Sequence, residues 1–65
     1  MYQVRQEYVE DLQGGRSKSE IARLLDLSVP YVIDVLNGKQ ACKRTTAIAF
    51  CYLVNGKLND FFRRI

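Results

Sequence analysis

Four basic side chains bracket one short apolar segment of this 65-residue chain. Lys18 precedes the segment, and Lys39, Lys43 and Arg44 follow it. Lysine and arginine are the residues that neutralise the phosphates of nucleic acids. The net charge of +3 permits a polyanionic partner without requiring one. Because the four cations cluster around a single segment, we expect them to contact phosphates rather than to form only a solvated basic surface.

The chain offers no constellation of residues for catalysis or for binding a metal. It contains no histidine and two cysteines, Cys42 and Cys51, so a structural zinc site would lack two ligands. Glu7, Glu10 and Asp11 lie on an expected surface helix, whereas catalytic carboxylate pairs occupy a concave, partly dry site. A glycine-rich phosphate loop is missing, as is a nucleophile with a base. We therefore expect neither an enzyme nor a cofactor.

Cysteine usage and hydropathy indicate the compartment. Small secreted scaffolds usually carry four or more cysteines, so two indicate a reducing environment. No signal peptide opens the chain, and the longest apolar run, residues 47–54, is too short to span a bilayer. We therefore expect a soluble cytoplasmic protein without a membrane partner, in which Cys51 is a small core residue.

Hydrophobic residues at helical spacing, separated by tight breaks, predict an all-α fold of five short helices in one domain, residues 1–65. No strand alternation is visible. The fourth helix, capped by Thr45 or Thr46, is apolar nearly all round, so we expect it to be the most buried. The expected helices cover residues 2–13, 17–25, 29–37, 47–54 and 58–65.

The second and third helices carry the clearest local signals. Ser17 and Glu20 fit a capping box at the start of the second helix. Ser28 is a good N-cap for the third, and Pro30 lies in its first turn, where its missing amide costs little. Gly38 ends the third helix. Two helices that cross steeply need a small residue at the crossing, which Ala22 supplies, and an apolar wedge. The wedge is expected from Ile21, Leu25, Leu27, Val32 and Val35.

These features resemble the lambda-repressor and Cro type of helix-turn-helix protein, the XRE family of phage and bacterial regulators. The resemblance rests on "EIARLLDLS" for the first helix and turn, "VIDVLNGKQ" for the second helix, and "LNDFF" for a closing short helix. It implies a helix-turn-helix at about residues 17–38, sequence-specific binding to double-stranded operator DNA, and frequently a homodimer on a palindrome. Asp26 stands where the family has glycine, and aspartate accepts left-handed backbone more readily than most residues.

The resemblance also implies which residues contact DNA. Carried over position by position, the family's DNA-reading positions fall on Ser28, Val29, Pro30, Tyr31, Ile33, Asp34 and Asn37. We expect the flanking contacts from Ser17, Lys18, Lys39, Gln40, Lys43 and Arg44. For Asn37 we favour a helix-ending role over a DNA contact. Tyr31 either reaches the groove or covers the edge of the core.

The same outward face supports a second hypothesis, because it is mostly apolar where the family has glutamines, arginines and serines. The alternative to a transcription regulator is a protein-binding module, such as an antirepressor, that uses Val29, Pro30, Tyr31 and Ile33 to bind another regulatory protein. A scaffold without a nucleic-acid role is a third, weaker hypothesis. The apolar carboxyl end supplies either core residues or a contact between two copies, for which the candidates are Phe61, Phe62 and Ile65.

Overall fold

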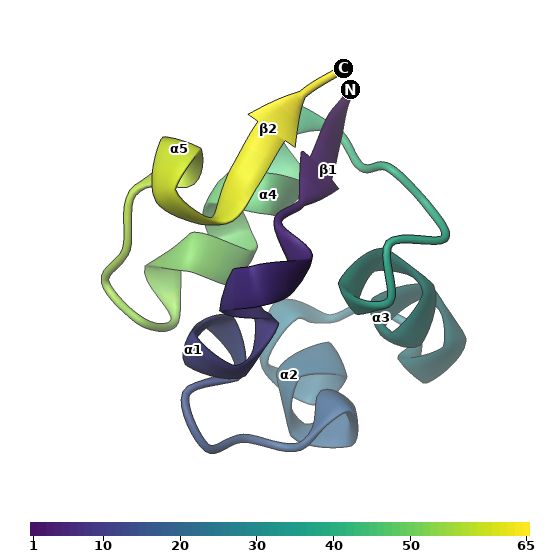
Figure 1. The fold of residues 1–65 in the computed structure, drawn as a ribbon. Helices are drawn as coiled ribbons and strands as arrows, with labels where there is room; N and C mark the ends of the chain where they lie inside the picture. Colours follow the sequence, from purple (N-terminus) through teal and green to yellow (C-terminus); the bar gives the residue numbers. More distant parts are fainter.

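The chain begins and ends in short strands that pair with each other, and helices occupy the path between them (Figure 1). This computed structural model describes residues 1–65. The elements are β1 (Tyr2–Val4), the 3-10 turn η1 (Gln6–Tyr8), α1 (Val9–Gln13), α2 (Lys18–Leu25), α3 (Val29–Leu36), α4 (Arg44–Tyr52), α5 (Leu58–Phe61) and β2 (Phe62–Arg64). The fold is thus mostly helical, as predicted, but it also contains a small sheet. No helix combines the length and the apolar character that a membrane crossing requires.

The two chain ends form an antiparallel pair that the sequence did not predict. The register pairs Tyr2 with Arg64, Gln3 with Arg63, and Val4 with Phe62. The amide of Ile65 donates to the carbonyl of Met1 at 3.0 Å, which continues the pairing to the last residue. The prediction of a helix over residues 2–13 is therefore wrong for residues 2–5, and so is the absence of strands; residues 6–8 form a 3-10 turn and α1 covers only Val9–Gln13. Val4 happens to fit a helical spacing, while its strand partner lies at the other end of the chain.

β1 also pairs on its second edge. The Tyr2 amide donates to the Cys42 carbonyl at 2.7 Å, and the Cys42 amide donates to the Tyr2 carbonyl at 2.8 Å. Cys42 lies in the connecting loop between α3 and α4, residues 37–43. The connecting loop is therefore fixed at Cys42 to the same strand that pairs with β2.

The predicted N-cap serines of α2 and α3 are confirmed, and of the capping box expected at α2 the structure shows the bond made by the serine. The hydroxyl of Ser17 accepts the Glu20 amide at 3.1 Å, and that of Ser28 accepts the Tyr31 amide at 3.3 Å. Between the helices, Asp26 adopts the left-handed conformation, with φ 56° and ψ 45°. Three residues, 26–28, thus turn the chain from α2 into α3, which pack against each other.

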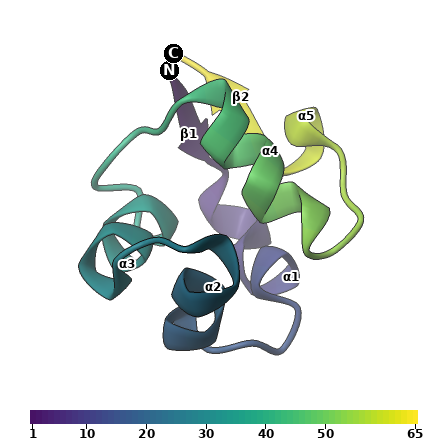
Figure 2. The ribbon, with the colours of Figure 1, turned by 180° about the vertical axis from the view of Figure 1, so that it is seen from behind.

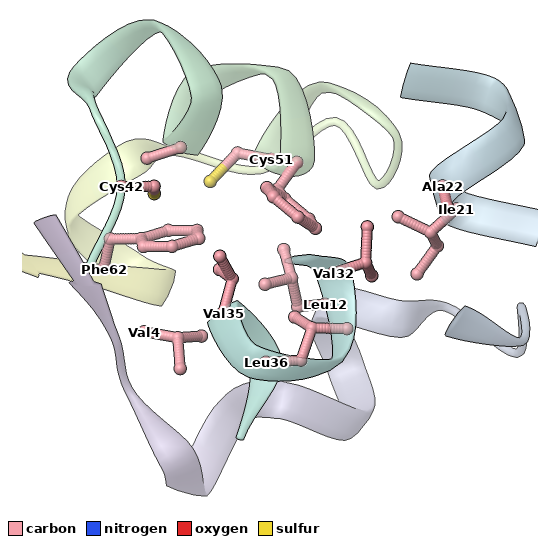
Figure 3. Packing of buried hydrophobic residues seen from close by; sticks show 12 residues of the cluster. Val4, Leu12, Ile21, Ala22, Val32, Val35, Leu36, Cys42, Cys51 and Phe62 are labelled. Carbon is pink, nitrogen blue, oxygen red and sulfur yellow. The ribbon is translucent and has the colours of Figure 1, made fainter. Parts of the chain in front are cut away.

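Side chains from every part of the chain meet in one core (Figure 3). The rings of Phe50 and Phe62 lie with their centroids 6.1 Å apart and their planes tilted by 47°. Of the predicted wedge, Ile21 and the two valines are buried, and both leucines pack against the core while partly exposed. The buried residues are Val4, Leu12, Ile21, Ala22, Val32, Val35, Leu36, Cys42, Ala47, Phe50, Cys51 and Phe62.

α4 differs from its prediction in its start and its burial. It begins at Arg44 with Lys43 as N-cap and no side-chain capping bond, so the predicted cap at residues 45–46 is wrong. Ile48 is 42% exposed and Tyr52 is 82% exposed, so the helix is not buried all round. Apolar residues on its outer face stay in solvent because only one side of α4 meets the rest of the chain. That side carries Ala47, Phe50 and Cys51.

The last predicted helix is shorter than expected. α5 ends at Phe61, and Phe62 has extended backbone, with φ −130° and ψ 156°. The Phe61 ring meets the Tyr8 ring edge to face at a centroid distance of 6.4 Å. Residues 62–64 leave the helical path because they pair with β1 and insert Phe62 into the core.

Candidate nucleic-acid interface

α3 has one side in the core and one side in solvent. Val32, Val35 and Leu36 are buried, whereas Val29 and Ile33 are each 37% exposed. The 3.6-residue period of the helix puts residues four apart on the same face, which confirms that Val29 and Ile33 point outward. Pro30 is exposed beside them. We call these three residues, Val29, Pro30 and Ile33, the α3 ridge.

Polar groups around the α3 ridge are few and mostly engaged. The Ser28 hydroxyl accepts the Tyr31 amide as N-cap. The Asp34 side chain is half-buried, and its backbone carbonyl accepts the amides of Lys39 at 2.9 Å and Gln40 at 3.2 Å. Asn37 is the exposed C-cap, which agrees with its helix-ending role. The outward side of α3 therefore presents apolar surface and one carboxylate, with few hydrogen-bond donors.

Tyr31 belongs to the edge of the core. Its side chain is half-buried and packs against the core residues. Burial raises the pKa of the Tyr31 phenol, the Cys42 thiol adds to the rise, and the Thr46 side chain opposes it. Since these neighbours lie in the connecting loop and α4, Tyr31 covers the junction of α3 with α4, the second of its two predicted roles.

The predicted phosphate-contacting residues lie on both sides of α3 along the chain. Lys18 is half-buried at the first position of α2, with Ser17 exposed as its N-cap. The four predicted phosphate-contacting residues that follow α3 are all exposed and lie along the connecting loop and at the start of α4. In Figure 2 the loop leads from α3 to the start of α4, with α2 below α3. These four residues are Lys39, Gln40, Lys43 and Arg44.

Two glutamines of the N-terminal segment hold the end of α3. The Gln3 amide Nε2 donates to the Gly38 carbonyl at 2.7 Å, and Gln6 Nε2 donates to the Leu36 carbonyl at 3.0 Å. The last carbonyls of a helix have no partner within the helix, so the bond to Leu36 satisfies a group that water would otherwise solvate, and the bond to Gly38 fixes the loop directly after α3. The sequence analysis missed both glutamines, and no local pattern signals them, because their partners lie 35 and 30 residues away.

An open hollow of about 410 Å³ lies between the N-terminal segment and α5. Arg5 is one of the residues that line this hollow, and its guanidinium is partly engaged, because Arg5 Nε donates to the Asn59 carbonyl at 3.1 Å. Figure 1 shows α5 and α3 on opposite sides of the molecule, so the hollow is separate from the α3 ridge. Nowhere do three histidine, cysteine or acidic side chains gather in a way that would hold a metal ion. The hollow is lined by Arg5, Tyr8, Asp11, Asn59, Asp60 and Phe61.

The three residues predicted to form a contact between two copies differ in their burial. Phe62 is wholly buried and has no surface with which to contact another molecule, so its prediction as a dimer contact is wrong. Phe61 is half-buried against Tyr8. Ile65 is 63% exposed at the chain end. Local spacing did not separate Phe61 from Phe62, because their different burial results from the change from helix to strand between them.

No protein-family model and no curated protein matches this chain. The candidate interface consists of α3 and the segments beside it. It offers a narrow apolar ridge on a packed helix, with the half-buried Lys18 before it in the chain and exposed cations after it. Such a surface suits a partner that combines apolar groups with negative charge.

Proposed function

We propose that this protein is a sequence-specific DNA-binding transcription regulator of the repressor and Cro type, which places α3 in the major groove. The observation that carries the proposal is the α2–α3 pair. A three-residue turn with Asp26 in the left-handed conformation packs α3 on α2 and leaves the α3 ridge uncovered. The major groove of B-DNA is wide enough for an α-helix presented in this way. The pair thus acts as a helix-turn-helix.

The surrounding charges support a DNA partner over an uncharged one. Lys18 lies in the first turn of α2, where helix amides and the helix dipole also favour a phosphate. The exposed Lys39, Lys43 and Arg44 lie beyond the other end of α3. Phosphate contacts on both flanks would fix the register of α3 on the duplex, while the α3 ridge faces the bases.

An anisotropy titration against a random duplex pool at several salt concentrations tests the proposal. Each phosphate neutralised should contribute about 0.9 to the fall of log affinity with log salt. Lys43→Ala should reduce that slope by about one. Lys57→Ala is the matched control, since Lys57 is an exposed lysine next to α5, on the side away from α3. Affinity that does not depend on salt would contradict the proposal.

The apolar character of the α3 ridge favours a second candidate function, a protein-binding module such as an antirepressor. An exposed apolar anchor with a charged rim is typical of protein interfaces. Ile33→Lys separates the two functions, because an added cation is tolerated beside DNA but weakens an apolar protein contact several-fold or more. The second function is favoured if Ile33→Lys abolishes activity in the cell while the purified wild-type protein binds no duplex.

A further inference from the structure

We infer that α3 recognises the 5-methyl groups of thymines through Val29 and Ile33, so that its half-site is defined by thymines one or two steps apart. This inference rests on the proposed function and names the DNA that it selects. The inference follows from a comparison of the outward side chains of α3 with the chemical groups that each base exposes in the major groove.

Hydrogen-bond readout of purines needs donors that the α3 ridge does not have. Guanine presents acceptors in the major groove, and adenine is read by groups that both donate and accept. Val29 and Ile33 have no polar side-chain atoms, and Pro30 also lacks a backbone N–H. The carboxylate of Asp34 only accepts, so it suits the amino group of cytosine. The thymine methyl is the base-edge group that an apolar side chain matches.

The geometry of α3 gives the expected spacing of the methyl groups. Side chains four residues apart on a helix have their Cβ atoms about 5–6 Å apart. Successive bases of one strand rise by about 3.4 Å. Val29 and Ile33 therefore span one or two base steps. Both are roughly two-thirds covered by their own neighbours, so they form a fixed surface rather than flexible arms.

Charge decides between DNA and a protein as the occupant of this ridge. Residues 17–28, before α3, carry two cations and two carboxylates, whereas residues 37–44, after α3, carry three cations and no carboxylate. Only the half-buried Asp34 interrupts the ridge itself. A thymine in duplex DNA provides an apolar methyl group beside the regularly spaced phosphates of the backbone. The α3 ridge and its flanking cations match both parts of that description.

Replacement of thymine by deoxyuridine tests the inference, because it removes the methyl group and no other atom. The probe is a duplex selected from a random pool with the wild-type protein, in which each thymine is replaced in turn. We expect about a four-fold loss of affinity at one or two positions, the factor that corresponds to about 0.8 kcal/mol per buried carbon at 1.4 kcal/mol per tenfold. Other thymines should show no change.

Two variants assign the methyl groups to side chains. Val29→Ala and Ile33→Ala should each abolish the deoxyuridine effect at its own position and leave the other unchanged. Ile48→Ala is the matched control, because Ile48 is a similarly exposed isoleucine on the outer face of α4. Thermal unfolding by circular dichroism verifies that all three variants fold. Ile33→Lys should keep salt-dependent affinity but lose the preference at the Ile33 position.

The outcomes separate this inference from the proposed function. Salt-dependent binding without any deoxyuridine effect overturns thymine recognition and leaves the proposed function standing. A large loss of affinity when guanine is replaced by 7-deazaguanine would show readout by donors, and also overturns it. If no duplex is bound with salt dependence, the proposed function itself fails, and thymine recognition fails with it.

Discussion

The α2–α3 pair and the paired chain ends are held together by interactions of very different range. In the α2–α3 pair, Ser17 and Ser28 cap amides three residues ahead, and the Leu27 amide reaches back to the Ala22 carbonyl. At the chain ends, Val4 pairs with Phe62, and Arg5 Nε reaches a carbonyl 54 residues away. The region that presents the α3 ridge is thus built locally, while the region that encloses the core depends on the whole chain.

This difference shows that the position of the α3 ridge also depends on residues that are distant from it in the sequence. β1 pairs with β2 on one edge and with Cys42 on the other. Gln3 of β1 bonds the Gly38 carbonyl just after α3, and Gln6 bonds the carbonyl of Leu36, the last residue of α3. A local helix pair therefore has its far end held by the chain termini. Perturbations of the two regions should therefore have distinguishable effects.

The largest effect is expected at the chain ends, from Phe62→Ala. Removal of a wholly buried phenylalanine ring that packs near Phe50 should lower the free energy of unfolding by about 3–5 kcal/mol. Urea denaturation measures the loss. Phe61→Ala is the control, because its ring is only half-buried and should cost clearly less. Equal losses for the two variants would show that the strand at residues 62–64 does not direct one ring into the core.

This comparison also explains what the sequence predicted and what it did not. The caps at Ser17 and Ser28, the turn at Asp26 and the outward position of Val29 and Ile33 were predictable, because each depends on residues within one or two helical turns. The strand at residues 2–4 was not, since only pairing with residues 62–64 distinguishes it from the start of a helix. In the candidate site, the role of Tyr31 stayed open for the same reason: packing against the connecting loop and α4 decides it.

Alkaline pH should weaken the core through ionisation of the buried Cys51 thiol. Burial raises the pKa of the Cys51 thiol from 9.0 to about 11, with Asp60 and Cys42 adding to the rise. The folded state therefore holds this proton more tightly than the unfolded state. Its stabilisation is complete below pH 9 and is lost as the pH rises through 11, a change on the order of 2 kcal/mol.

The measurement is the urea midpoint of the wild-type protein and of Cys51→Ala between pH 8 and pH 11. The wild-type midpoint should fall more steeply across this range, because the variant has no thiol at that position to ionise. Groups that do not interact with the Cys51 thiol titrate in both proteins and cancel in the difference. Parallel profiles would mean that the Cys51 thiol ionises equally easily in the folded and unfolded chains.

Loss of one cap should weaken the α2–α3 pair by a smaller amount. Ser28→Ala removes the hydroxyl that accepts the Tyr31 amide and should cost about 1 kcal/mol. Ser19→Ala is the matched control, because Ser19 is an exposed serine inside the first turn of α2, where alanine is a good helix former. Thermal unfolding compares the two. A similar cost for both would indicate that the cap does not fix the start of α3.

The smallest effect tests the connection between the two regions. Gln3→Met and Gln6→Met keep the length of the side chain but remove the amide donors to the end of α3. Each should lower the free energy of unfolding by about 0.5 kcal/mol, the low end of the usual contribution of one hydrogen bond, because both side chains are partly solvated. Gln13→Met is the matched control, because Gln13 Nε2 makes an equivalent 3.0 Å bond to the Arg16 carbonyl after α1.

Amide hydrogen exchange decides whether these glutamines position α3 or only add to global stability. The amides of Lys39 and Gln40, which donate to the Asp34 carbonyl, close the last turn after α3. If Gln3 and Gln6 hold this turn, these two amides should exchange faster in both variants, while the amides inside α2 stay protected. The Gln13 variant should leave Lys39 and Gln40 unchanged. A uniform acceleration at all amides, or none at Lys39 and Gln40, would show that the chain ends stabilise the core without holding the end of α3.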